Sequence, residues 1–263
     1  MARTSRLAEP ARLWTGAATV VALVAFWYFG SKGGLINPQV FPTPEQFGSA
    51  ARQLLVGEGF ADGRLHQHVL QSVKLILMGF FAASSVGVAL GLWMGWNRTA
   101  EALINPIFLL IRPIPALAWI PLAIVWLGLD DAAKVMILWF AAFVPSVINS
   151  FTGVRSIERP IIEASQMLGI RGWSLVKDVI IPGALPSIFT GLRLSLQACL
   201  TALVAAELLG AILGMGKVLY QAGLDIYPAM ILAGMVTVAV VGFALTALLD
   251  FAERRSMPWR NQH

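Results

Sequence analysis

The chain has 263 residues, of which 57% are hydrophobic and 13% charged, with a formal net charge of +5 and a mean hydropathy of +0.74. Soluble domains carry about 25% charged residues, so the composition indicates an integral membrane protein without room for a separate soluble domain. The single Cys199 lies in an apolar run, which excludes a disulfide framework and a CxxC metal site. The three histidines are too few and too scattered for a metal site, and we expect the pair His66 and His68 in a loop.

The first predicted element is a transmembrane helix over residues 13–30. This run contains no charge, ends in aromatic residues and follows three arginines. It is long for the apolar part of a signal peptide and no small-x-small cleavage site follows it, so a retained span is favoured over a cleaved signal. Residues 31–69 are mixed and polar, with a short helix expected from Pro44, and form a connecting segment too short to bury its own core.

The second span is predicted over residues 69–96 and has a small residue at every fourth position. This stripe consists of Gly79, Ala83, Gly87, Gly91 and Gly95. Positions four apart lie on one face of a helix, and small residues there let another helix approach closely. Glycine is common in membrane helices in general. Five small residues in register nevertheless favour packing against a partner helix, in this subunit or in another.

The third predicted span, residues 103–127, is interrupted by prolines. They are Pro106, Pro113, Pro115 and Pro121, and Arg112 lies directly before the second of them. Prolines free backbone carbonyls, which a membrane tolerates only where protein buries them or a wet cavity receives them. The stretch around Arg112, Pro113, Pro115 and Pro121 is therefore a candidate for the translocation path. Alternatively, Arg112 reaches the cytoplasmic headgroups or pairs with another residue, which would avoid a cost of roughly 2.5–3.5 kcal/mol.

The fifth predicted span, residues 184–213, contains two charged residues, Arg193 and Glu207. They are fourteen residues apart, which is about 21 Å along a helix, so they cannot pair with each other within one helix. Each of them therefore needs a partner on another helix, or water.

The distribution of positive charge orients a six-span chain. The fourth span is predicted over residues 132–151, beside a short turn with Asp130, Asp131 and Lys134, and the sixth over residues 229–251. The ends on the side of both termini hold eleven basic residues: Arg3, Arg6, Arg12, Arg98, Arg155, Arg159, Arg171, Lys177, Arg254, Arg255 and Arg260. The opposite loops hold five: Lys32, Arg52, Arg64, Lys134 and Lys217. This bias places both termini and the loop 152–183 in the cytoplasm.

The loop 152–183 is expected to form two short helices. Pro160 suits the first turn of a helix, and one face of that helix would hold Ile161, Ala164, Ser165 and Leu168. Gly169 stands where a left-handed residue would end the helix. One side of the second helix would hold Leu175, Val176, Val179 and Ile180, and we expect Pro182 to stop it. An amphipathic helix resting on the membrane surface is the alternative interpretation.

The spacing within this loop resembles the EAA loop of the permease subunits of ABC importers. The matching residues are Glu163, Ala164, Ser165, Gly169, Val179, Ile181 and Pro182. Three of them depart from the family pattern, because Ser165 replaces an alanine, Val179 an isoleucine and Ile181 a leucine. The resemblance implies that the loop docks into a groove on a cytoplasmic ATPase and transmits closure of the ATPase dimer to the membrane helices.

The similarity extends from about Trp27 to Trp259 and points to the nitrate, taurine and aliphatic-sulfonate branch of type I importers. The motifs that support it include residues 112–122, 153–155, 182–186, 190–193 and 205–208. The resemblance implies an all-α fold of six transmembrane helices, with the whole chain as one permease domain. It also implies a bacterial plasma-membrane location, a permease homodimer in lipid, a cytoplasmic ATPase dimer with ATP-Mg, and an extracytoplasmic solute-binding protein.

The resemblance does not fix the solute. A small anion is expected, with a sulfonate or taurine first and nitrate, bicarbonate, an aromatic carboxylate or a neutral pyrimidine as alternatives. No nucleic acid partner and no cofactor within the chain are expected. The sequence has no phosphate-binding loop of the Gly-x-x-x-x-Gly-Lys-Ser/Thr type, so ATP hydrolysis must come from another subunit. A membrane enzyme would need several facing acids or histidines within its spans. A structural subunit would not need the proline-broken third span.

Overall fold

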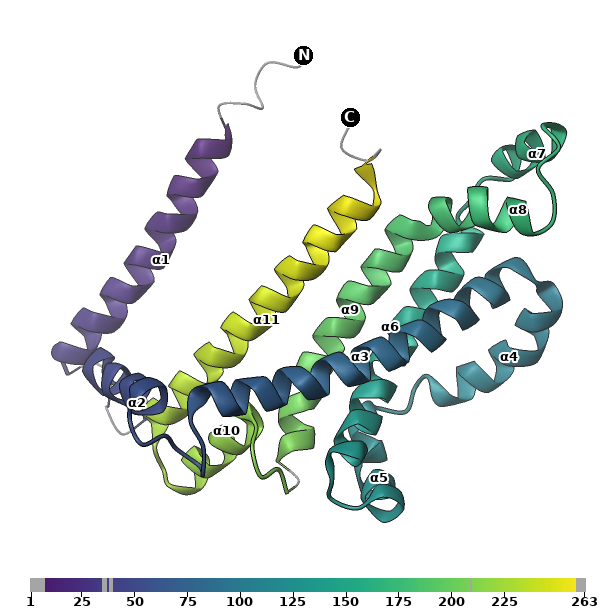
Figure 1. Ribbon diagram of the computed structural model, residues 1–263. Helices are drawn as coiled ribbons and strands as arrows, with labels where there is room; N and C mark the ends of the chain where they lie inside the picture. The colour runs from purple at the N-terminus through teal and green to yellow at the C-terminus, as the bar shows by residue number, and fades with distance from the viewer. Residues whose placement is uncertain (1–7, 35–36, 38–39, 209, 259–263) are drawn as a thin grey trace.

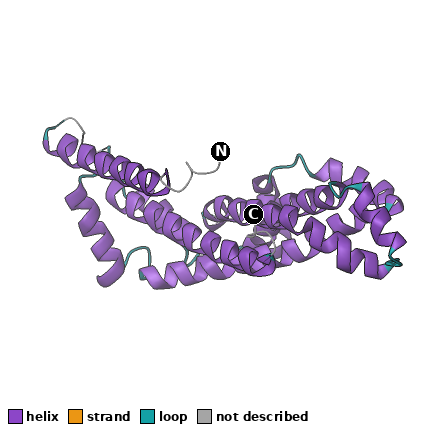
Figure 2. Ribbon diagram, turned by 90° about the horizontal axis from the view of Figure 1, so that it is seen from above, coloured by secondary structure: helices purple, strands orange, loops and turns teal. Residues whose placement is uncertain are grey.

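The computed structural model describes residues 8–34, 37, 40–208 and 210–258, and this part of the chain is built from helices (Figures 1 and 2). In chain order the α-helices are α1 (Ala8–Lys32), α2 (Pro44–Val56), α3 (Leu65–Trp96), α4 (Arg98–Ile111), α5 (Ile120–Leu127), α6 (Asp131–Arg155), α7 (Arg159–Met167), α8 (Trp173–Leu175), α9 (Ile181–Glu207), α10 (Met215–Leu224) and α11 (Pro228–Ser256). A 3₁₀ turn, η1 (Ala116–Trp119), precedes α5, and a π-helical turn, η2 (Val176–Ile180), joins α8 to α9.

Three long helices form the core, with α6 packed between α3 and α9. Their buried side chains make one cluster, which includes Leu75, Phe80, Leu138, Cys199 and Leu203. The remaining long helices lie outside this core. Helix α11 contacts α10, α2 and α9, and α1 touches the rest of the described chain mainly through α2. Seen from above, the helices spread into an elongated layer rather than a closed bundle (Figure 2).

The stripe of small residues on α3 faces α6, as its spacing predicted. A Cβ atom at Gly79 would lie 2.5 Å from the Cβ of Leu138, and one at Gly91 would lie 2.5 Å from the carbonyl oxygen of Val147. Real Cβ atoms essentially never come this close to a neighbour. The absence of side chains on α3 therefore lets the backbones of the two helices touch. The predicted partner helix is α6 of the same subunit.

Within the described residues, four helical segments are long and apolar enough to cross a membrane: α3, α6, the continuous run Trp173–Glu207 and α11. The pair formed by α4 and the segment Ala116–Leu127 gives a fifth span if the two are counted together, although they are bent by 83°. Helix α1 contributes the described apolar stretch Ala18–Lys32, which is not counted among these spans. The structure confirms an all-helical polytopic chain, and the sixth span stays a prediction.

The two ends of the molecule differ in what they hold (Figure 1). Four segments lie toward one end: the first turn of α1, the last turn of α11, the connection from α3 to α4, and the α7–α8 segment. Helices α2, α5 and α10 lie toward the other. Both ends of the described chain therefore share a side with the predicted coupling loop, which is the arrangement that six spans require.

Several predicted boundaries were wrong. Pro182 does not stop a helix, because it lies in the first turn of α9, where no backbone donor is lost, and the helical chain runs on from η2. The fifth span ends at Glu207, before the predicted residue 213. His66 and His68 lie in the first turn of α3 rather than in a loop. Asp131 and Lys134 likewise belong to the first turns of α6.

Candidate functional site

The predicted coupling loop forms a small projection at one end of the molecule, here called the knob and consisting of α7, α8 and η2 (Figure 1). Helix α7 starts at Arg159, with Pro160 in its first turn, and ends at Met167. Gly169 follows with a φ of 85°, the left-handed conformation that the sequence predicted at this position. Gly172 has a φ of 60° and sets the entry into α8. The two glycines turn the chain between the short helices.

One side of the knob is packed and the other is open. Leu175 and Ile180 are buried in a cluster with Val154 and Ala184 from α6 and α9, and Val176 and Val179 pack against this cluster. The opposite side exposes large apolar side chains, with Met167 87% and Trp173 73% exposed. The packed side fixes the knob to α6 and α9. The open side is an apolar surface without a partner among the described residues.

The residues of the EAA-like pattern lie on both parts of this segment. Glu163 and Ala164 are exposed on α7, and the hydroxyl of Ser165 donates to the carbonyl oxygen of Ile161 at 2.8 Å. Ile181 and Pro182 form the first turn of α9 and are half-buried, as is Val179 in η2. The pattern therefore joins an exposed tip to the start of a core helix. That is the layout needed to pass a movement from one to the other.

The predicted interruption of the third span is a sharp break between α4 and η1. Ile111 ends α4, Pro115 precedes η1, and Pro121 lies in the first turn of α5. Trp119 stacks on Phe140 of α6, with ring centroids 4.0 Å apart, which holds the broken segment against the core.

A groove of about 430 Å³ lies beside this break. Its lining includes Arg112, Pro115, Phe140 and Pro145, together with Thr201 of α9. Arg112 is exposed and lies level with the middle of α6, not near the knob end as the sequence suggested. The reason is that α4 starts at the last turn of α6, where Glu101 pairs with Arg155, and runs back along it.

Arg193 pairs with two acids of α11. Its guanidinium donates to the carboxylate of Asp250 at 2.8 Å and also contacts the carboxylate of Glu253. Side chains of Arg193 and Asp250 are 42% and 41% exposed, so the cluster is only partly shielded. These contacts tie α9 to α11 at the knob half of the bundle.

Glu207 is buried at the other end of α9 and accepts two hydrogen bonds. Ser72 of α3 donates its hydroxyl to Oε1 at 2.7 Å, and the backbone N–H of Gly216 donates to Oε2 at 2.6 Å. The same Ser72 oxygen accepts the N–H of Met215 at 2.9 Å. Glu207 and Ser72 together hold the segment that follows α9 against the start of α3.

His68 extends this network. Its Nδ1 accepts the N–H of Gly214 at 3.0 Å, so Nε2 holds the ring hydrogen and donates it to the carbonyl oxygen of Phe60 at 2.9 Å. Sequence reasoning missed both His68 and Ser72 as partners of the Glu207 segment. Their spacing of four residues at the start of α3 was the available signal, because it puts both polar side chains on one face of an apolar helix.

Comparison with known proteins places this architecture. Residues 87–260 match the family described as "Binding-protein-dependent transport system inner membrane component". The chain belongs to this family. It is 34% identical to the taurine transport system permease protein TauC of Escherichia coli (strain K12), over 93% of this chain and 89% of that protein. It is 30% identical to the putative aliphatic sulfonates transport permease protein SsuC of Bacillus subtilis (strain 168), over 92% of this chain and 86% of that protein.

A solved structure supports the fold assignment. The chain resembles one titled "Inward facing conformations of the MetNI methionine ABC transporter", with a TM-score of 0.60 and 24% identity, covering 73% of this chain and 93% of that chain. This likeness concerns the fold. Membership of the binding-protein-dependent transport family makes the chain a permease subunit of an ABC importer, which is not itself an enzyme. The predicted family and class are confirmed.

Proposed function

We propose that this chain is the membrane subunit through which an ATP-driven importer takes up a small organic sulfonate, taurine first among them. The main support for this proposal is the similarity to the taurine permease, which extends over 93% of the chain at 34% identity. The second relative, named for aliphatic sulfonates, favours the same class of solute. A relative named as a bicarbonate permease is 27% identical over 90% of the chain, so a small inorganic anion is the alternative.

The knob is the proposed docking site for a cytoplasmic ABC ATPase dimer, which would hold ATP-Mg. Met167, Leu168 and Trp173 give it an exposed apolar surface to bury, and Glu163 adds an acid beside them. This assignment puts the knob end and both termini in the cytoplasm, in agreement with the excess of basic residues there. The opposite end then faces an extracytoplasmic solute-binding protein. In a bacterium, the membrane would be the plasma membrane.

The groove beside Arg112, Pro113, Pro115 and Pro121 is the proposed translocation path. The break frees backbone groups, and irregular backbone persists in a membrane where it lines a wet cavity. Arg112 adds positive potential for an anion. We propose that the whole chain is one permease domain that acts as a homodimer in lipid, since a second copy would cover the open side of the elongated layer. Arg193 and Glu207 then hold helices together rather than contact the solute.

Growth tests can identify which solute the transporter takes up. A strain lacking this gene should fail to use taurine or an alkanesulfonate as sole sulfur source and should still grow on sulfate. Complementation with the intact gene should restore growth. Loss of growth on nitrate, bicarbonate, an aromatic carboxylate or a pyrimidine alone would reassign the solute. A strain that loses none of these abilities would favour a structural subunit without a transport path.

A fused reporter that is active only in the cytoplasm can test the orientation of the chain in the membrane. Fused at Gly172 in the knob, it should be active, and fused at Gly59 between α2 and α3, it should be inactive. Activity at Gly59 would contradict the proposed arrangement.

A further inference from the structure

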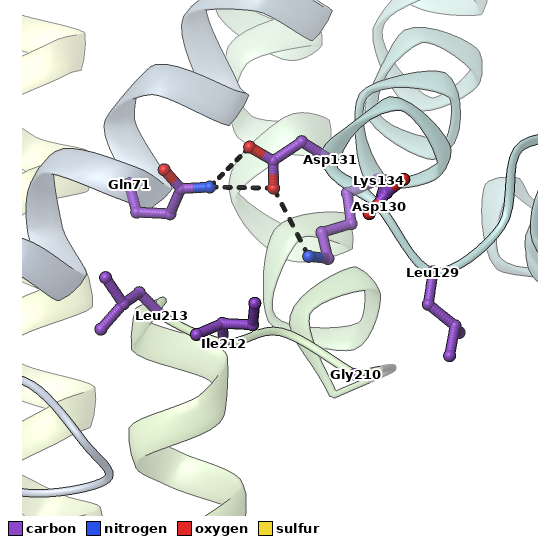
Figure 3. Close-up of a pocket in the computed structure, with 8 residues that line it drawn as sticks. All are labelled: Gln71, Leu129, Asp130, Asp131, Lys134, Gly210, Ile212 and Leu213. Atoms are coloured by element: carbon purple, nitrogen blue, oxygen red, sulfur yellow. Dashed lines mark hydrogen bonds and ion pairs between the residues drawn. The ribbon is translucent and has the colours of Figure 1, made fainter.

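A second cavity lies at the end of the molecule opposite the knob. Its volume is about 500 Å³, and its walls come from the start of α3, the turn before α6 and the segment between α9 and α10 (Figure 3). The residues that line it are Gln71, Leu129, Asp130, Asp131, Lys134, Gly210, Ile212 and Leu213. We call it the Lys134 pocket. It is separate from the groove beside Arg112, and none of its residues was assigned a role above.

Lys134 is a buried cation at the wall of this pocket. Its side chain is only 6% exposed, and its one recorded ion pair within the described chain is to Asp131, at 3.5 Å. An ammonium group has three N–H donors, so at least two remain for another acceptor. Removing an ammonium from water is costly unless it is paired and hydrogen-bonded. A buried charged residue in a membrane protein points to a function.

Asp131 does not use up this positive charge. Its two oxygens accept from the amide of Gln71 at 2.9 and 2.8 Å (Figure 3). Lys74 adds a further contact at 3.4 Å. The Asp131 carboxylate is therefore satisfied by three partners, and it does not occupy all the donors of Lys134. Glu207 is a further acid that interacts with Lys134.

Asp130 provides a charge of the opposite sign in the same pocket. It precedes α6, is exposed, and its side chain makes no capping hydrogen bond to the helix. No ion pair of Asp130 is found in the described part of the chain. Asp130 is the N-cap residue of α6, and it lines the pocket together with Lys134. The pocket thus presents a carboxylate and an ammonium group, with Leu129, Ile212 and Leu213 as its apolar surface.

The third wall of the pocket is held in place by polar contacts. Lys217 donates to the carbonyl oxygen of Ile212 at 2.8 Å and to the carboxylate of Asp62 at 2.7 Å. The latter contact lowers the pKa of Asp62 from its ordinary value, so this acid keeps its charge. The Glu207 network fixes the chain at Gly214, directly after the pocket residues. Contacts within the chain therefore hold this wall of the cavity, and binding sites for small molecules are usually largely pre-formed in this way.

We propose that the Lys134 pocket is a solute subsite that receives a small zwitterion, with its acid group on Lys134 and its ammonium group on Asp130. A simple anion would meet Lys134 but also the negative charge of Asp130, whereas an aminosulfonate matches both. The apolar residues suit the short alkyl spacer between the two groups. The inference rests on the proposed function, because it selects aminosulfonates within the sulfonates.

Binding to the purified permease–ATPase complex in lipid nanodiscs tests this subsite. Radiolabelled taurine and radiolabelled ethanesulfonate, which lacks the amine, are the two probes. The wild type should bind taurine more tightly than ethanesulfonate. Lys134→Gln should weaken the binding of both probes about tenfold or more, which is the size expected for a lost charged hydrogen bond. Lys134→Arg should retain part of the affinity.

Asp130→Asn should affect the binding of the two probes differently. Asparagine precedes a helix as well as aspartate does, so the fold is retained, and taurine should bind about tenfold more weakly while ethanesulfonate binds as well as before or better. Glu58→Gln removes another exposed acid at the same end, outside the pocket, and should change neither affinity.

Uptake by the complete transporter distinguishes the outcomes. If the wild type imports taurine while Lys134→Gln and Asp130→Asn bind it unchanged, the subsite is refuted and the proposed function stands. If the wild type imports no sulfonate, the proposed function fails and the subsite with it. Equal weakening of both probes by Asp130→Asn would refute the zwitterion assignment.

Discussion

Replacing Gly91 by alanine tests how closely α3 and α6 approach each other. The new Cβ would lie 2.5 Å from the carbonyl oxygen of Val147, 2.7 Å from the Cβ of Ser150 and 3.0 Å from the backbone nitrogen of Phe151. Ordinary contact at a Cβ begins at 3.4 Å. Two of the three neighbours are backbone atoms, so no side-chain rotation relieves the overlap, and the helices must separate.

Overpacking of this kind costs about 1–3 kcal/mol. For chains of 150–250 residues, about 2–4 °C of melting temperature corresponds to 1 kcal/mol, so Gly91→Ala should lower the unfolding temperature by roughly 2–12 °C. Tryptophan fluorescence of the detergent-purified protein during heating can measure this, since the chain has nine tryptophans.

Gly223→Ala is the matched control. Gly223 lies in α10, and a Cβ there would meet nothing within 4 Å. This variant should melt at or slightly above the wild-type temperature, because alanine favours a helix more than glycine does. If Gly91→Ala melts like Gly223→Ala, the tight approach of α3 and α6 is wrong.

Three further variants test the knob and the charged residues. Gly169→Val places a β-branched residue at a φ of 85°, so ATPase co-purification and uptake should fall while membrane insertion is retained; normal uptake would remove the knob from its proposed role. Arg193→Gln removes the guanidinium that Asp250 and Glu253 contact, so it should destabilise the protein by about 1–2 kcal/mol and lower the amount of assembled protein. This cost is below the roughly 3–5 kcal/mol of fully buried pairs because the cluster is partly exposed. Arg193→Gln with Asp250→Asn should recover part of the lost protein, and loss of uptake at normal protein level would argue for a pathway role instead. Gly214→Ala brings a Cβ to 2.5 Å from the carboxyl carbon of Glu207 at a φ of 149°, which should cost about 1–3 kcal/mol and weaken taurine binding to the nanodisc complex; wild-type binding and melting would contradict the network.

Local patterns predicted the packing of α3 and the turn of the knob. The small residues of α3 lie four apart, and helix geometry alone puts them on one face whatever the partner is. Gly169 follows an amphipathic stretch, and glycine is the residue that tolerates a positive φ there. Both predictions depend on residues within a few turns of each other, so the sequence was sufficient.

Contacts between distant residues could not be predicted in the same way. Ser72 and Glu207 are 135 residues apart, and Gln71 and Asp131 are 60 apart. Asp131 and Lys134 have the spacing of an exposed charged turn, and only the position of α3 makes Lys134 buried. Pro182 was misjudged for a related reason. A proline stops a helix when its missing N–H and its ring disrupt the preceding turn, whereas Pro182 lies in the first turn of α9, directly after the π-helical turn η2.

The continuity of α9 relates the two ends of the molecule. Its 27 residues span about 40 Å, begin at the last residues of the knob and end at Glu207, whose carboxylate holds the wall of the Lys134 pocket. A helix of this length can tilt as one rigid element. A tilt of about 10° around its midpoint would displace each end by about 3–4 Å in opposite directions, given its length. If the knob is displaced as proposed, the movement would reach the far pocket through a single secondary-structure element, without a relay of side chains.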